Sequence, residues 1–219
     1  MIYLDKQYNT VLKHAVAELE EKKSRFIASV MPVSSEEEAL NFINEIKTKN
    51  WDATHNVYSY YIGGSSIIQR FSDDGEPSGT AGLPILEVIK RMEVRDLVVV
   101  VTRYFGGTLL GAAGLVRAYG KSASLAIEEA EIITKKLCTE VSIMVEYDLF
   151  GKVQNMLISK DYIIKEIIYE QDVEIIVFVD EGRMEDLTKL VNEVTNARCI
   201  IEPGNKNYIS LDAQGKLIL

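Results

Sequence analysis

The stretch VTRYFGGTLLGAAGLVRAYGK, residues 101–121, contains five of the chain's fourteen glycines and three of its cations. No acidic residue occurs between Leu97 and Ile127, although the whole chain of 219 residues carries a net charge of −9. The segment DLVVVVTRYF, at 96–105, opens with a run of β-branched residues, which predicts a buried central strand. From about Gly111 onward the apolar residues have helical spacing. A strand is therefore expected to pass through a glycine-rich turn into a helix.

Such a turn can bind an anion. Paired glycines adopt backbone angles that other residues avoid, and free N–H groups there and at a helix N-terminus attract negative charge. On the predicted helix, Gly114, Arg117 and Lys121 share one face because they are three and four residues apart. Tyr104 and Phe105, which follow Arg103, offer planes on which bases can stack. We therefore predict an RNA- or anion-binding surface. Its residues are Arg103, Tyr104, Gly106, Gly107, Gly111, Gly114, Arg117 and Lys121.

The same glycines also have a purely structural interpretation. Gly111 and Gly114 would let the helix pack closely on the sheet without any ligand. The segment contains neither a G-x-x-x-x-G-K-[ST] loop nor a G-x-G-x-x-G fingerprint, so ATP or dinucleotide binding of the usual kinds is not predicted. Packing and anion binding both remain open from the residues alone.

A second motif, DDGEPSGTAG at 73–82, predicts an acidic turn in front of another helix. The Asp-Gly dipeptide is typical of a tight turn, and Ser78 or Thr80 is expected to cap the helix. Alternatively, the carboxylates bind a hard cation, form an acid/base pair, or orient Arg103 or Arg117. We predict a supporting role, with no metal, no cofactor and no catalytic residue. The acidic residues are Asp73, Asp74 and Glu76.

The hydrophobic periodicities predict an α+β protein of two domains. Residues 137–203 follow the order βαββαβ of a ferredoxin-like split βαβ unit. The predicted domains are 1–135 and 136–203, with a C-terminal tail at 204–219. The expected strands are 23–33, 56–63, a short one from 67, 96–105, 137–147, 162–170, 173–181 and 197–203. The expected helices are 34–50, 83–92, 111–130, 148–161 and 182–196.

Composition indicates a soluble globular protein, with 47% hydrophobic and 26% charged residues. The N-terminus lacks the apolar core of a signal peptide and no apolar run approaches a bilayer's thickness, so we expect a cytoplasmic protein with no membrane association. Cys138 and Cys199 have no C-x-x-C spacing and are expected to be reduced. The sequence pI of about 4.9 argues against RNA binding over the whole surface. Residues 1–135 carry a net charge of −3 and residues 136–219 carry −6, which favours an anion site in the first domain.

Three motifs in this order resemble the Impact/YigZ family: KSRF at 23–26, DDGEPSGTAGLP at 73–84, and RYFGG-x-x-LG with GLVRAY at 103–119. One departure is Ala113, where the family usually has glycine. The resemblance covers nearly all of residues 20–203. It implies a first domain with a β-α-β fold similar to elongation factor G domain four, and a ferredoxin-like second domain similar to domain five of that factor. Eukaryotic relatives regulate translation by competing for a scaffold protein that activates a stress kinase.

Three functional hypotheses follow. The first is a non-enzymatic, translation-associated regulator that binds RNA or the ribosome through its glycine-rich basic surface. The alternative is a regulator that binds a protein of the translation machinery and has no RNA affinity. The third is a phosphate-ester hydrolase that uses the acidic turn, although the sequence identifies no nucleophile or base for it.

Overall fold

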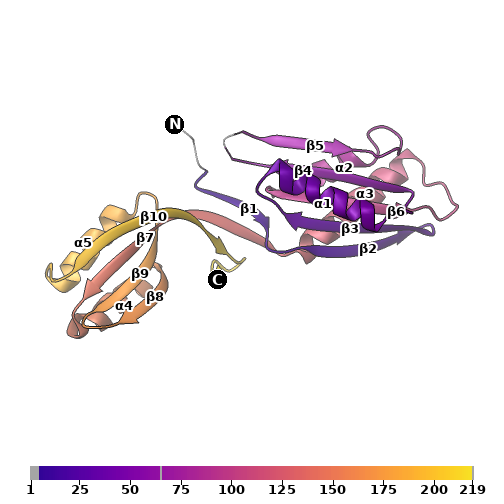
Figure 1. Ribbon diagram of the computed structural model, residues 1–219. Coiled ribbons are helices and arrows are strands. Elements are labelled where there is room, and N and C mark those ends of the chain that lie inside the picture. Colours follow the sequence, from indigo (N-terminus) through magenta and orange to yellow (C-terminus); the bar gives the residue numbers. More distant parts are fainter. Residues whose placement is uncertain (1–4, 65, 219) are drawn as a thin grey trace. The chain divides into compact units, whose positions relative to one another are not determined.

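The computed structural model describes residues 5–64 and 66–218 and divides into two compact units (Figure 1). The division falls between Thr134 and Lys135. Residues 1 and 219, where the predicted first domain begins and the predicted tail ends, lie outside the described ranges. No helix in the described part of the chain is both long and apolar enough to cross a membrane.

The first unit contains an antiparallel five-stranded sheet with helices on both faces. Its elements are β1 (Gln7–Val11), β2 (Ala15–Glu21), β3 (Ser24–Pro32), α1 (Glu36–Lys49), β4 (His55–Ile62), β5 (Ile68–Ser72), α2 (Gly82–Arg91), β6 (Leu97–Tyr104) and α3 (Ala112–Glu129). The sheet has the order β2-β3-β6-β4-β5. Figure 1 shows α1 in front of it and α2 and α3 behind it.

The first five residues of the central strand β6, from Leu97 to Val101, are all apolar because both faces of the strand are covered. Val98 and Val100 pack in the cluster that contains α1, whereas Val99 and Val101 pack in the cluster that contains α2 and α3. An unbroken apolar run is the pattern expected of a strand buried on two sides. The prediction of a buried central strand that leads into a helix is confirmed.

The start of α2 differs from the expectation. Neither Ser78 nor Thr80 caps this helix. Instead, Asp73 Oδ1 accepts the backbone N–H groups of Ala81 and Gly82 at 3.1 and 2.8 Å. The acidic turn folds back on itself, so a carboxylate far upstream reaches the helix start, where negative charge is favoured.

The strand β2 was not predicted from the sequence. Ala15, Ala17 and Leu19 pack in the core, and the residues between them are exposed, so the alternation is that of a half-buried strand. The hairpin from β2 to β3 turns at Lys22 and Lys23, which have φ values of 48° and 67°. Lysine seldom adopts positive φ, and the usual Asn-Gly or Asp-Gly signal of such a hairpin is absent.

The second unit has the strand order of a ferredoxin-like fold. Its elements are β7 (Ile132–Val145), which begins just before the division, α4 (Tyr147–Ser159), β8 (Ile163–Tyr169), β9 (Val173–Asp180), α5 (Met184–Thr195), β10 (Ile200–Leu211) and β11 (Leu217–Ile218). The sheet order is β11-β10-β7-β9-β8, and residues of α4 and α5 share one core cluster with β7 and β9. The predicted two-domain α+β class is confirmed.

The last strand is longer than predicted. β10 continues through Pro203 to Leu211, so the first half of the predicted tail at 204–219 belongs to the sheet. Gly204 explains how the strand passes this point: a Cβ on it would lie 3.2 Å from the carbonyl oxygen of Glu140. The Pro-Gly pair is typical of a strand end, which is why the sequence pattern stopped there.

Candidate functional site

Residues from all three motifs meet in a buried polar cluster between β6 and α3. Glu76 Oε1 accepts hydrogen bonds from Arg103 Nη1 at 2.5 Å and from the Tyr119 hydroxyl at 2.7 Å. Arg103 Nη2 donates to Ser24 Oγ at 3.3 Å. The side chains of Arg103 and Glu76 are only 6% and 4% exposed, so the two charges neutralise each other inside the protein. We call Ser24, Glu76, Arg103 and Tyr119 the arginine cluster.

The Tyr119 hydroxyl acts as a permanent donor in this cluster. Burial, and next its hydrogen bond to Glu76, raise the pKa of Tyr119 well above the ordinary tyrosine value. Its ring packs edge-on against Phe26 at 5.2 Å between centroids, and the Arg103 guanidinium lies 5.3 Å from the same Phe26 ring. The cluster therefore joins β3, β6 and α3 through both polar and aromatic contacts.

His55 lies at the edge of the arginine cluster. Its Nδ1 is 2.8 Å from the carbonyl oxygen of Asp74, which can only accept, so Nδ1 carries a proton. Its Nε2 is 3.9 Å from Glu76 Oε2. The acidic turn thus fixes the ring orientation of His55.

The three carboxylates of the acidic turn have different partners. Asp73 binds the start of α2, Glu76 belongs to the arginine cluster, and Asp74 accepts Lys47 Nζ at 2.8 Å and the Asn56 backbone N–H at 2.7 Å. In the described part of the chain, no group of three or more His, Cys, Asp or Glu is placed to hold a metal. The turn is therefore bound to the fold, and Glu76 orients Arg103, which was one of the supporting roles considered.

The glycines of the turn serve the backbone first. A Cβ on Gly106 would lie 2.0 Å from the carbonyl carbon of Lys23, so only glycine lets the turn approach the β2–β3 hairpin. Gly107 and Gly111 have φ values of 79° and 70°, a region that favours glycine. Gly114 faces the side chain of the loop residue four positions before it. Close packing therefore accounts for Gly106 and Gly114.

Tyr104 lies on the opposite face of the sheet from the arginine cluster. It follows Val100 and Thr102 on the α1 side of β6, and its hydroxyl donates to Asp52 Oδ1 at 3.1 Å. Desolvation, and next this hydrogen bond, raise the pKa of Tyr104. The sheet separates Tyr104 from the cations of α3.

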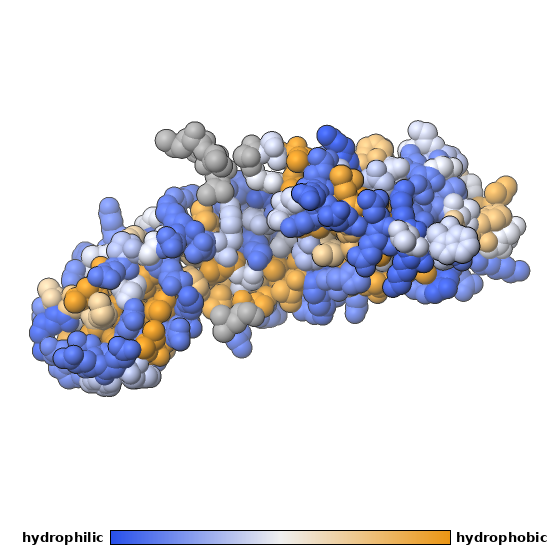
Figure 2. Space-filling view, in the orientation of Figure 1, coloured by the Kyte–Doolittle hydropathy of each residue, from blue (hydrophilic) through white to orange (hydrophobic). Residues whose placement is uncertain are grey.

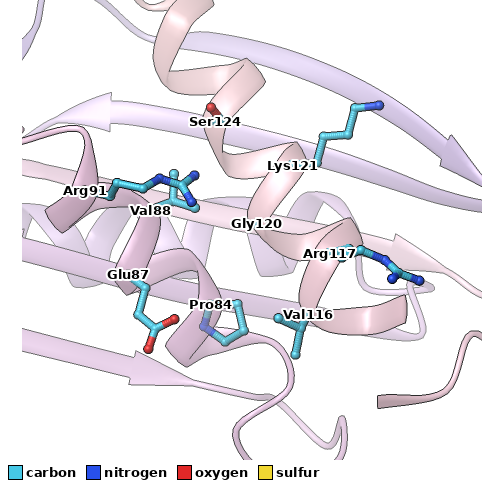
Figure 3. A pocket seen from close by; sticks show the side chains of 9 residues that line it. All are labelled: Pro84, Glu87, Val88, Arg91, Val116, Arg117, Gly120, Lys121 and Ser124. Carbon is cyan, nitrogen blue, oxygen red and sulfur yellow. The ribbon is translucent and has the colours of Figure 1, made fainter. Parts of the chain in front are cut away.

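Four exposed cations lie on and beside α3. Figure 3 shows the side chains of Arg117 and Lys121 leaving the helix on the same side. Both line a groove of about 530 Å³ between α2 and α3, and both line a hollow of about 250 Å³ beside β2. Arg91 lines the groove and Lys22 lines the hollow, and each space also has one glutamate in its lining. We call Lys22, Arg91, Arg117 and Lys121 the cationic ridge.

None of the four ridge cations forms an ion pair with any residue that the structure describes. The residues predicted for the anion-binding surface therefore do not form one surface. Arg103 is buried, Tyr104 lies on the other face of the sheet, the glycines shape the turn, and Arg117 and Lys121 are exposed on α3. Lys22 and Arg91 were not among the residues predicted for the anion-binding surface. Lys22 directly precedes the KSRF motif, which is the signal that could have suggested it.

Comparisons with known proteins agree with this architecture. The Impact N-terminal domain model matches residues 22–127, and the model of a domain of unknown function, DUF1949, matches residues 143–198. The IMPACT family member YvyE of Bacillus subtilis (strain 168) is 42% identical over 202 residues, which cover 92% of this chain and 93% of the relative. The IMPACT family member YigZ of Escherichia coli (strain K12) is 36% identical over 150 residues, covering 64% and 74%.

A solved structure also matches over most of the chain. It is described as the crystal structure of a hypothetical protein, and it aligns with a TM-score of 0.59 at 28% identity. The alignment covers 92% of this chain and 99% of the other. With both domain models matched and a relative of similar length at 42% identity, the chain belongs to the Impact family.

Proposed function

We propose that this protein is a non-enzymatic, translation-associated regulator that binds RNA, alone or within the ribosome, through the cationic ridge. Membership of the Impact family supports a regulatory or translation-related role in general. The observation that carries the finer proposal is the set of four exposed cations on and beside α3, none of which has an ion pair with a described residue, in a chain with a net charge of −9.

Charge distribution favours phosphate as the ligand of the ridge. Unpaired cations on both sides of α3 outnumber the two glutamates in the linings, and α3 itself has no acidic residue before Glu128. RNA would be repelled by most of an acidic surface and attracted here, so the charge pattern also orients the complex.

The buried cluster supports the ridge. The contacts among Glu76, Arg103 and Tyr119 tie α3 to the central strand, and Gly106 holds the hairpin that carries Lys22. Because these contacts are internal, the ridge is presented on fixed backbone and less ordering is needed on binding. The KSRF, acidic-turn and RYFGG motifs then contribute to binding indirectly, because they position the helix and the hairpin that carry the ridge cations.

The test is a salt titration of RNA binding by the wild type and Arg117→Glu, using purified ribosomes, structured RNA and single-stranded RNA. The new glutamate would precede Lys121 by four residues, an order that stabilises a helix, so the variant should fold. We expect affinity to fall at least tenfold and the slope of log affinity against log salt to become smaller in magnitude by about 1 or more. An Arg117→Glu variant that binds all three as tightly as the wild type would overturn the proposal.

A matched pair separates local from global charge. Lys121→Glu and Lys152→Glu change the net charge equally on exposed helical positions, but Lys152 lies in α4 of the second unit. We expect RNA affinity to fall for Lys121→Glu only. Equal losses in both variants would contradict a localised site. Retention of ribosomal proteins after nuclease treatment would instead favour the protein-binding alternative.

A further inference from the structure

A second site lies at the N-terminal end of α3, in a cavity of about 390 Å³ beside the arginine cluster. One wall is polar and comes from His55, Glu76 and Arg103. The other walls are mainly apolar, and the half-exposed Phe105 ring lies 5.5 Å from the Arg103 guanidinium. The main apolar lining residues are Phe105, Leu109, Leu110 and Leu115.

The loop that encloses this cavity is unusually apolar for a surface segment. Leu109 is 84% exposed and Phe105 is 45% exposed. In Figure 1 the loop between β6 and α3 projects at the right-hand end of the first unit, and hydrophobic residues gather there in Figure 2. Contact between these apolar side chains and water is unfavourable in the free protein. A bound ligand with an apolar part would cover them and remove some of this contact.

The start of α3 gives the cavity a positive end. Gly111 and Ala112 line the cavity, no side chain caps the helix, and its first turn contains no acidic residue. The first N–H groups of a helix have no acceptor within it, so those of this 18-residue helix remain available to an anion. The one carboxylate in the lining, Glu76, is 4% exposed and already paired with Arg103.

One nitrogen of the arginine cluster has no acceptor. Among the residues that the structure describes, Arg103 Nε is buried without a hydrogen-bond partner, while Nη1 and Nη2 each donate one hydrogen bond. A buried N–H without an acceptor is costly, and its side chain forms part of the cavity wall. This second feature, independent of the helix end, leaves the polar wall of the cavity with an unmatched donor on a cationic side chain.

We propose that this cavity binds a small amphiphilic anion. The ligand's apolar body lies against Phe105, Leu109 and Leu115, and its anionic head meets the first amides of α3 beside His55. The volume lies within the range of small-molecule sites and is too small for a folded partner. Neither Arg117 nor Lys121 lines the cavity, so the site is separate from the cationic ridge.

The test compares the binding of two probes that have the same apolar body. Isothermal titration calorimetry on the full chain measures the affinity and the stoichiometry of each probe. 8-Anilinonaphthalene-1-sulfonate carries an anionic head, and N-phenyl-1-naphthylamine lacks it. We expect saturable binding of one sulfonate probe per chain, at least tenfold tighter than binding of the neutral probe. No saturable binding of the sulfonate, or equal affinity for the two probes, overturns the proposal.

Two substitutions locate the site. Ala112 and Ala113 are neighbouring exposed residues in the first turn of α3, but of the two only Ala112 lines the cavity. An aspartate at either position favours the helix, so both variants should fold. Ala112→Asp should weaken sulfonate binding about tenfold, and Ala113→Asp by less than threefold. Equal affinities in the two variants would overturn the location, whereas the RNA affinity of Arg117→Glu tests only the ridge.

Discussion

The two arginines of the glycine-rich stretch have opposite surroundings although they lie only fourteen positions apart. Arg103 lies inside the first unit, paired with Glu76 and stacked between aromatic rings. Arg117 is exposed on α3 and has no ion pair with any described residue. Two cations of one local pattern therefore have different surroundings: the first holds elements of the fold together, and the second is exposed on the surface where we propose the RNA site.

The difference shows which kind of charge can act at a distance. A buried cation that has a carboxylate at hydrogen-bond distance contributes little field outside the protein, but removal of its partner is expensive. An exposed cation without a partner costs little to keep and contributes to the surface potential. Stability and binding should therefore respond in opposite ways to substitutions in the two regions.

Replacement of Gly106 by alanine should have the largest effect. The new Cβ would lie 2.0 Å from the carbonyl carbon of Lys23, and backbone cannot yield as a flexible side chain would. We expect a loss of more than about 4 kcal/mol, or failure to fold, measured by urea unfolding. Gly120→Ala is the control, since its Cβ would meet only the Val88 side chain at 3.5 Å, and helix propensity predicts a gain of about 0.5–1 kcal/mol.

Glu76→Gln should be next. The substitution removes the charge that neutralises buried Arg103, and breaking a buried pair costs about 3–5 kcal/mol. The matched control is Glu87→Gln, an exposed residue in the lining of the groove, for which a change within about 0.5 kcal/mol is expected. Similar urea midpoints for the two variants would show that the arginine cluster does not hold the fold.

Tyr119→Phe should cost about 1–2 kcal/mol at neutral pH, because Glu76 loses one donor. The pKa of Tyr119 is raised in the folded protein, so above about pH 10 the hydroxyl ionises in the unfolded chain first. The unfolded state then binds fewer protons, and wild-type stability falls as pH rises, by up to about 1.4 kcal/mol per unit from this group.

The phenylalanine variant lacks this ionisation, so the stability difference between the two proteins should shrink at alkaline pH. Urea unfolding at pH 7 and pH 11 measures it, with the exposed residue Tyr169 changed to Phe as the control. A difference that stays constant or widens at pH 11 would argue against a raised pKa for Tyr119.

Arg117→Gln should have the smallest effect on stability, within about 0.5 kcal/mol, because the side chain is exposed and has no ion pair in the described part of the chain. RNA affinity should nevertheless fall, and the salt slope should shrink by about 1. Parallel urea and binding titrations check both quantities. A clear loss of stability without any loss of affinity would reverse the roles assigned to the two arginines.

The sequence by itself determined the elements with strong local periodicity. The β-branched run of β6, the helical spacing of α3 and the βαββαβ order of the second unit depend on neighbours a few residues apart, which a chain displays directly. β2 and the end of β10 were missed because a Lys-Lys hairpin and a Pro-Gly pair inside a strand contradict the usual turn signals. The three motifs also pointed to the correct family.

Only the tertiary structure decided which charges are buried. The partner of Arg103 lies 27 residues away in sequence and its second acceptor lies 79 residues away, so no local pattern distinguishes it from Arg117. The same holds for Gly106, which is required by a hairpin more than eighty residues upstream. A polar side chain is buried only where segments that are distant in the sequence pack around it and supply its hydrogen-bond partners. Those contacts form only in the folded chain.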